Sequence, residues 1–316
     1  MADVPASGTQ HTLRSGDYEA VVASVGASLR SLTHAGRDLV VPFRADQVRP
    51  AYRGVTLVPW PNRVVDGRYT DAGTQYQLPL TEPERGHALH GLGVWLDWAT
   101  VASGPSHVVL ETVVQPQTGY PWRLLVRTEF TLDADGGLTQ TVTAVNESDT
   151  PAPYGTGPHP YLVAGDGTVD DWTLELPAAD LLQVTPDRLV PISLAPAATV
   201  DADRFDYLSP RRIGPAEIDH AYTGLQRDAA GNATVRLTDA DGRGVAITWD
   251  AACPWVQVHT ADLMPGAPGH RAGLAVEPMT CAPDAFNAGE YPYDAGLRHI
   301  APGASSSAGW RILAIH

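Results

Sequence analysis

Glycine and proline interrupt this chain so often that long helices have little room to form. The 316 residues include 30 glycines and 27 prolines, spread along the sequence without a periodic or low-complexity tract. Proline removes a backbone donor from a helix interior, and glycine weakens helices and strands alike. No window of twelve or more residues keeps a clean helical period of about 3.6. The sequence therefore favours short strands joined by turns.

The segments between these turns alternate apolar and polar residues, which is typical of half-buried β-strands. Several consecutive segments form pairs of similar length around a tight, glycine-containing turn. Hairpins are predicted over residues 27–41, 68–78, 122–145 and 233–249, and further strands over 255–260, 273–276 and 310–315. Many short strands at regular spacing indicate an all-β protein, either a sandwich or a barrel.

One domain is predicted over residues 1–316, because no proline-rich or serine-rich linker divides the chain. A chain of this length buries roughly three quarters of its unfolded surface, so its core needs no disulfide or structural metal. Residues 1–10 are expected to form a flexible tail. The N-terminus lacks a signal-peptide pattern, and no apolar run is long enough to span a membrane, so a cytoplasmic location is expected.

The charged residues exclude several classes of partner and enzyme. Acidic residues outnumber basic ones 36 to 21, and the net charge of −15 argues against nucleic-acid and anionic-membrane partners. Every basic residue is an arginine, which excludes lysine Schiff bases and the P-loop lysine. The two cysteines, Cys253 and Cys281, are too few for a disulfide framework and lack metal-ligand spacing. A reducing compartment is therefore expected.

Four segments place polar residues inside sequence rich in glycine, proline or apolar residues. A rigid Pro-Trp-Pro-Asn-Arg segment ends at Arg63, and two histidines, His87 and His90, lie beside glycines. His159 stands between two prolines, as a positioned proton donor or acceptor would. Glu277 ends an apolar, strand-like run, and burial in a cleft would raise its pKa toward the range of a general base.

Each of these residues also has a purely structural interpretation. Arg63 could belong to a surface loop exposed to solvent, and His159 could be a buried polar group with its hydrogen bonds satisfied. Glu277 could end a strand and face solvent. His87 and His90 have a spacing that metal ligands use, but no cysteine or carboxylate accompanies them at ligand spacing. A histidine that binds a sugar or a carboxylate is the preferred interpretation. Taken one at a time, the four segments do not identify a function.

Together, the order of these segments and the residues within them resemble the aldose 1-epimerase (galactose mutarotase) family from about Val55 to the C-terminus. Three departures from the family pattern concern substrate preference and indicate a bacterial subgroup. Pro158 replaces asparagine, Leu162 stands where phenylalanine is common, and residues 57–60 replace a segment that often contains Gly-Arg. The motifs that carry the resemblance are residues 61–64, 66–69, 89–92, 159–161, 218–220, 276–278, 283–287 and 300–303.

The resemblance implies an all-β fold, the large antiparallel β-sandwich (supersandwich) of galactose mutarotases, with an open sugar cleft and no metal or cofactor. It also implies an isomerase that interconverts the α and β anomers of an aldohexose. Glu277 matches the general base and His159 the general acid, while His90, Arg63 and Asp219 match residues that hold the sugar. A monomer or homodimer is expected, with a small-molecule sugar as its partner and neither nucleic acid nor membrane.

Anomer exchange requires that the anomeric hydroxyl loses its proton while the ring oxygen gains one, so that the ring opens to an aldehyde. A carboxylate and an imidazolium on opposite sides of the anomeric centre would perform both transfers and exchange roles on reclosure. The neighbouring glutamate is expected to favour the charged imidazole and to raise the His159 pKa above its ordinary value of about 6.5.

Three other functions remain open. A hexose-6-phosphate epimerase would need arginines at the cleft rim, for which Arg85, Arg211 and Arg212 are the candidates. A non-catalytic carbohydrate-binding protein would keep the fold without the chemistry, although the intact acid–base pair argues against it. A glycoside hydrolase would use Asp219 and Glu277 as its two carboxylates, which leaves the proline-framed histidine unexplained.

Four further residues are kept out of the predicted site. Trp60, Trp95 and Trp255 have faces on which a pyranose stacks, but large aromatic residues are more often part of the core. Cys281 lies four residues after Glu277 and is interpreted as a small buried apolar residue rather than a nucleophile.

Overall fold

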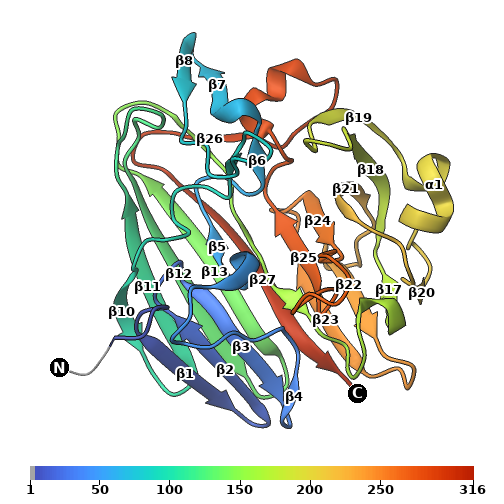
Figure 1. The fold of residues 1–316 in the computed structure, drawn as a ribbon. Helices are drawn as coiled ribbons and strands as arrows, with labels where there is room; N and C mark the ends of the chain where they lie inside the picture. The colour runs from blue at the N-terminus through green and yellow to red at the C-terminus, as the bar shows by residue number, and fades with distance from the viewer. Residues whose placement is uncertain (1–3) are drawn as a thin grey trace.

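The computed structural model describes residues 4–316, and its strands form two large antiparallel sheets and several smaller ones (Figure 1). The larger sheet has nine strands, and the last strand of the chain, β27 (Ser305–Ile315), lies at its centre. On one side of β27 the order is β13 (Gly137–Asn146), β12 (Leu124–Asp133), β11 (His107–Val114) and β10 (Ala99–Ser103). On the other side it is β23 (Gly244–Trp249), β22 (Ala233–Thr238), β17 (Thr173–Glu175) and β20 (Arg211–Arg212).

The second large sheet has six strands and contributes the centre of the candidate site. Its order is β16 (Tyr161–Leu162), β25 (Leu274–Met279), β24 (Trp255–His259), β21 (Asp219–Leu225), β18 (Ala178–Val184) and β19 (Pro191–Pro196). Every neighbouring pair is antiparallel. All six residues of β25 are buried, so both faces of this strand are covered by other parts of the structure.

Smaller sheets complete the architecture. The N-terminal strands form a four-stranded sheet, and its first two strands pack against β12. These strands are β1 (Gln10–Ser15), β2 (Tyr18–Ala23), β3 (Ser28–His34) and β4 (Arg37–Asp38). Four two-stranded pairs join β5 (Thr56–Leu57) to β15 (Gly157–Pro158), β6 (Arg63–Val64) to β9 (Ala88–Leu89), β7 (Arg68–Asp71) to β8 (Thr74–Gln77) and β14 (Ala152–Tyr154) to β26 (Arg298–Ile300).

Helices are few and short. The single α-helix in residues 4–316, α1 (Ala197–Phe205), packs against β18 and β19 (Figure 1). Single-turn 3₁₀ segments are η1 (Pro50–Tyr52), η2 (Val65–Gly67) and η3 (Val169–Asp171). The 3₁₀ segment η4 (Ala285–Glu290) is longer. Across the described chain, no helix has the length and apolar character needed to cross a membrane.

One cluster of buried apolar side chains connects the sheets. It runs from Leu13 to Ala314 and includes Val258 of the six-stranded sheet and Ile312 of the nine-stranded sheet. Burial alternates along β12, so that one face of this strand packs into the core and the other meets solvent. The predicted antiparallel β-sandwich is therefore confirmed.

The predicted hairpins are also present, whereas the predicted tail at residues 1–10 is wrong for residues 7–10. Residues 27–41 contain the β3–β4 pair, and residues 68–78, 122–145 and 233–249 contain β7–β8, β12–β13 and β22–β23. Ser7 is buried and donates a backbone hydrogen bond to Ala45, and Gln10 pairs with Ala23. Residues 7–10 are thus part of the folded structure, and residues 1–3 lie outside the described part of the chain.

Candidate active site

The predicted acid–base pair is in direct contact. Glu277 lies on the buried strand β25, opposite Gln257 of β24. His159 lies between β15 and β16, and the flanking prolines restrict its backbone. Its Nε2 is 3.4 Å from Oε1 of Glu277, and both side chains are almost fully buried. The fold thus joins two groups that are far apart in the sequence.

This contact corrects the expected placement on opposite sides of the anomeric centre. A separation of 3.4 Å leaves no space for a sugar carbon between the carboxyl group and the imidazole. The anomeric hydroxyl and the ring oxygen are bonded to the same carbon, so the two groups need to reach two neighbouring oxygen atoms. Two adjoining groups on one side of the anomeric centre meet this requirement.

Burial determines which of the two groups carries a proton, and it favours a neutral imidazole instead of the expected charged one. Desolvation, reinforced by His259, lowers the pKa of His159 to about 3. Desolvation and the neighbouring Asp219 raise the pKa of Glu277 well above its ordinary value, and Arg63 only partly offsets them. The expectation of a charged imidazole is wrong, because burial outweighs attraction to the carboxylate. In the free site, a proton shared by the pair is held on Glu277.

Aromatic rings pack around His159. The ring centroid of His90 lies 4.9 Å away in an edge-to-face arrangement, and that of Tyr161 lies 5.2 Å away in a stacked one. Tyr52 packs edge-on against His90, with centroids 4.7 Å apart. Burial, followed by His159, lowers the pKa of His90 well below its ordinary value, so the second histidine is also neutral. The rings therefore form a fixed, uncharged wall beside the acid–base pair.

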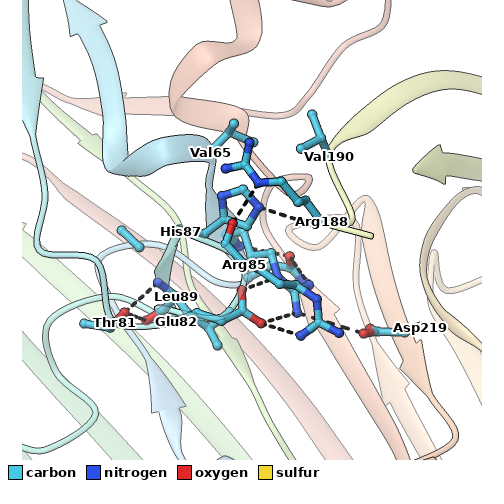
Figure 2. Close-up of polar contacts among 12 residues, drawn as sticks. Val65, Thr81, Glu82, Arg85, His87, Leu89, Arg188, Val190 and Asp219 are labelled. Atoms are coloured by element: carbon cyan, nitrogen blue, oxygen red, sulfur yellow. Dashed lines mark hydrogen bonds and ion pairs between the residues drawn. The ribbon is translucent and has the colours of Figure 1, made fainter. Parts of the chain in front are cut away.

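Arg63 is held by a carboxylate that the sequence analysis did not single out (Figure 2). Nε and Nη2 of Arg63 donate to the two oxygens of Glu82 at 2.8 and 3.0 Å, and Nη1 of Arg85 donates to the same carboxylate at 2.8 Å. Nη2 of Arg63 also lies 3.9 Å from Oδ2 of Asp219, while Gln257 donates to the other oxygen of Asp219 at 2.6 Å. Glu82 and Gln257 thus orient the two predicted sugar-binding residues.

The motif at residues 283–287 holds the strand that carries Arg63. The backbone N–H of Asp284 donates to the Arg63 carbonyl at 2.7 Å, and the backbone N–H of Val65 donates to Oδ1 of Asp284 at 2.8 Å. Asn287 and the hydroxyl of Tyr291 also donate to this carboxylate. Burial raises the pKa of Asp284 to about 6. This part of the motif is therefore a support for β6.

All five predicted site residues line one cleft of about 380 Å³, a volume typical of small-molecule sites. These residues are Glu277, His159, His90, Arg63 and Asp219. Tyr52, Gln257 and His259 line the same cleft and were not predicted from the sequence. Gln257 and His259 are polar residues two positions apart on an apolar strand, and this alternation was the available signal. Tyr52 ends the short 3₁₀ segment η1 and Glu82 lies in an irregular segment, and neither carries such a pattern.

His87 is a structural residue. It is fully buried, its Nδ1 accepts the backbone N–H of Asp66 at 3.2 Å, and its Nε2 lies 2.8 Å from the Arg188 carbonyl oxygen. Both ring nitrogens are therefore engaged, and the tautomer with the proton on Nε2 satisfies both contacts. The two-histidine metal site considered from the sequence does not fit this donor arrangement.

The remaining sequence candidates lie outside the cleft. Trp60 and Trp255 are buried in the core, and Trp95 is exposed and stacks on Arg49. Cys281 is buried, which raises the pKa of its thiol to about 12, as expected for an inert cysteine.

The three arginines considered for a sugar phosphate do not cluster at the cleft. Arg211 and Arg212 lie on β20, where their guanidinium groups bond to backbone oxygens of Asp203, Asp206 and Asp170. Of the three candidate arginines, Arg85 alone lines the cleft, and it is paired with Glu82.

Comparison with known sequences agrees with this geometry. The family model for aldose 1-epimerase matches residues 9–308. The uncharacterized protein YihR of Escherichia coli strain K12 is 32% identical over 289 residues, which cover 92% of this chain and 89% of that protein. The galactose mutarotase of Mus musculus is 25% identical over 309 residues, which cover 89% and 87% of the two chains.

Solved structures share the fold. The GalM/aldose epimerase homologue from C. elegans superposes with a TM-score of 0.81 at 20% identity, covering 98% of this chain and 99% of that one. Galactose 1-epimerase from Lactobacillus acidophilus gives a TM-score of 0.77 at 18% identity, covering 96% and 94%. With the family model spanning nearly the whole chain, this protein belongs to the aldose 1-epimerase family, whose members are isomerases that act on sugars.

Proposed function

We propose that this protein is a mutarotase that interconverts the α and β anomers of an aldohexose by acid–base ring opening and reclosure. The observation that carries this proposal is the buried contact of 3.4 Å between Nε2 of His159 and Oε1 of Glu277, inside a cleft of sugar-binding size. Two adjoining groups that hold one proton between them match a reaction that moves protons on two oxygens of one carbon.

The reaction begins with transfer of the shared proton from Glu277 to His159. The Glu277 carboxylate then accepts the proton of the anomeric hydroxyl, the imidazolium of His159 protonates the ring oxygen, and the bond from the anomeric carbon to the ring oxygen breaks. This step leaves a protonated Glu277 and a neutral His159, the state that burial favours. Rotation about the adjacent carbon–carbon bond and the reverse transfers give the other anomer. Each group contributes roughly 10²- to 10⁴-fold to such a reaction.

His90, Arg63 and Asp219 hold the sugar in this proposal. Arg63 supplies guanidinium donors, and Asp219 supplies a carboxylate acceptor. The hydrogen bonds that Arg63 donates to Glu82 limit the orientations of its guanidinium group. His90 supplies a neutral ring whose buried Nδ1 has no partner within residues 4–316. No proton transfer is assigned to these three residues.

The test is the rate of anomer exchange, followed by NMR or polarimetry on free and phosphorylated aldoses, with the uncatalysed rate subtracted. We expect acceleration of at least one free aldohexose. No acceleration of any aldose would indicate a carbohydrate-binding protein without the chemistry, and acceleration of phosphorylated sugars alone would indicate a sugar-phosphate epimerase.

A further inference from the structure

One large apolar side chain of the catalytic cleft is open to solvent. Leu263 lines the cleft and is 50% exposed, and among the exposed large apolar residues of the described chain it alone lines this space. The polar groups of the cleft suit the hydroxyls of a sugar, but a leucine side chain forms no hydrogen bond. Contact of such a side chain with water is unfavourable, so a ligand with an apolar surface binds better when it covers Leu263.

Leu263 lies in the connection between β24 and β25, which is closed at its base. The backbone N–H of Arg271 donates to the Ala261 carbonyl at 3.0 Å, so residues 262–270 form an Ω-loop with joined ends. Ala261 and Arg271 have φ angles of 57° and 48°, in the left-handed region that residues other than glycine rarely adopt. Such a backbone persists only where the surrounding structure holds it, so the base of the loop is fixed.

The buried Arg271 anchors this base. Its Nη1 donates to Oδ1 of Asp262, and its Nη2 donates to the Gly214 carbonyl at 2.7 Å. The other oxygen of Asp262 accepts the hydroxyl of Thr260. Both oxygens of Asp262 are therefore engaged within the protein, although this residue lines the cleft. Asp262 thus holds the start of the loop, directly before Leu263.

His270 holds the backbone of Leu263 itself. The backbone N–H of Leu263 donates to Nδ1 of His270 at 3.1 Å, across the loop. The backbone N–H of Ala267 donates to the Met264 carbonyl at 2.9 Å, and that of His270 donates to the Ala267 carbonyl at 3.0 Å. These bonds place Leu263 at the cleft without a ligand, which reduces the ordering cost of binding.

The loop also packs against two segments that line the cleft, β16 and the end of η1. At its base, Ala261 packs with Tyr161 of β16, whose ring stacks on His159. Near its other end, a Cβ on Gly269 would lie 3.0 Å from Nη2 of Arg53, the residue that follows η1. The position of the loop is therefore set by the same segments that form the site.

We propose that Leu263 is a further sugar-binding residue, whose side chain covers a C–H surface of the pyranose while Arg63 and Asp219 bind its hydroxyls. A pyranose carries C–H groups on the faces of its ring and hydroxyls around its edge, so both kinds of contact fit one bound orientation. This inference rests on the proposed mutarotase function and adds an apolar contact to its site. Leu263 touches no reacting atom, so it affects KM rather than kcat.

The test compares Leu263→Ser with Met264→Ser, which changes the next residue of the same loop. Met264 is 81% exposed and does not line the cleft, so its substitution is the matched control. Anomer exchange of glucose, galactose and mannose gives KM and kcat, and saturation-transfer NMR titrations with these sugars give Kd. We expect Leu263→Ser to raise KM and Kd by roughly tenfold with kcat within about threefold, and Met264→Ser to leave all three within about twofold. Leu263→Met keeps an apolar side chain of similar volume and should keep KM within about threefold.

Substitutions of His270 test how Leu263 is held in place. Phenylalanine keeps a ring but accepts no hydrogen bond, whereas asparagine offers an acceptor oxygen in place of Nδ1. We expect His270→Phe to raise KM by roughly threefold or more, and His270→Asn to keep KM within about twofold. An unchanged KM in His270→Phe would show that this hydrogen bond does not position Leu263.

Other results contradict the proposal in distinguishable ways. If anomers are exchanged and Leu263→Ser has no larger effect on KM and Kd than Met264→Ser, Leu263 does not bind the sugar and the mutarotase function stands. A lower melting temperature of Leu263→Ser with an unchanged Kd would assign Leu263 to the fold alone. If the sugars bind without being exchanged, the mutarotase function fails, and the Kd of Leu263→Ser still decides the contact. If none of the sugars binds, both proposals fail.

Discussion

At the scale of single residues, burial and a neighbouring carboxylate control the proposed acid–base pair and the orientation of Arg63. Glu277 and His159 stand in recognisable motifs, whereas Glu82 stands between Thr81 and Pro83 in an irregular segment. The protonation of the pair was also beyond prediction, because it depends on burial by strands that are distant in the sequence. The motifs indicate the two residues that we propose as base and acid, and the surrounding packing determines their charge.

Glu82→Gln should weaken sugar binding more than it slows the chemistry. The amide keeps the size of the side chain but loses the charged bidentate contact that orients Arg63. We expect KM to rise by roughly tenfold with kcat changed by less than about threefold. Steady-state anomer exchange measures both values, and Glu84→Gln is the control because Glu84 lines the same cleft and is exposed. Equal effects of the two substitutions would argue against a positioning role for Glu82.

The pH dependence of kcat/KM should form a broad plateau. The reactive pair holds one proton, so activity falls when both groups are protonated, below the His159 pKa of about 3, and when both have lost their protons, above the raised pKa of Glu277. We therefore expect no acid-side loss between about pH 7 and about pH 5, where an ordinary histidine titrates. Measuring kcat/KM across this pH range, with circular dichroism as a check on folding, tests this expectation. An acid limb near about pH 6.5 would show that burial does not control His159.

At the scale of elements, local pairings were predictable and distant ones were not. The hairpins β7–β8, β12–β13 and β22–β23 are joined by short turns whose residues are visible in the sequence. The pairing of β6 with β9, and of β24 with β21 and β25, joins segments separated by long stretches of chain, and no local pattern specifies it. The helix α1 was also missed, since its nine residues are too few for a helical period to show.

Asp284→Ala should disturb the element that carries Arg63. Three groups donate to this buried carboxylate, including the backbone N–H of Val65, and the substitution leaves them without an acceptor. We expect the free energy of unfolding to fall by about 1–3 kcal/mol and KM to rise. Chemical denaturation and anomer exchange measure these effects, with Glu290→Ala on the exposed part of η4 as the control. Unchanged stability and KM would mean that β6 does not depend on this contact.

At the scale of the whole molecule, the C-terminal strand connects the two halves of the larger sheet. β27 pairs with β13 on one side and with β23 on the other, and Ala308, Trp310 and Ile312 belong to the common core. Sequence analysis predicted a strand at residues 310–315 but not its central place, because a strand pattern does not reveal its neighbours. This strand therefore joins the two halves of the larger sheet into one.

A chain that ends at Ala304, without β27, should fail to fold. Loss of β27 would expose the edges of β13 and β23 and remove core side chains from the centre of the larger sheet. We expect loss of soluble, cooperatively melting protein in circular dichroism, whereas a control that ends at Ile315 should melt like the full chain. Cooperative melting of the shorter chain would contradict the central role of β27.

The exchange rate of Glu277→Gln tests the central claim most directly. The amide has nearly the shape of the protonated carboxyl group that burial favours, so the fold and the melting temperature should be preserved, but it accepts no proton from the anomeric hydroxyl. NMR exchange spectroscopy on the best aldohexose should show turnover lowered by roughly 10²-fold or more relative to the unsubstituted enzyme. Near-normal exchange in a folded Glu277→Gln enzyme would show that Glu277 is not the base and that the paired-proton mechanism is wrong.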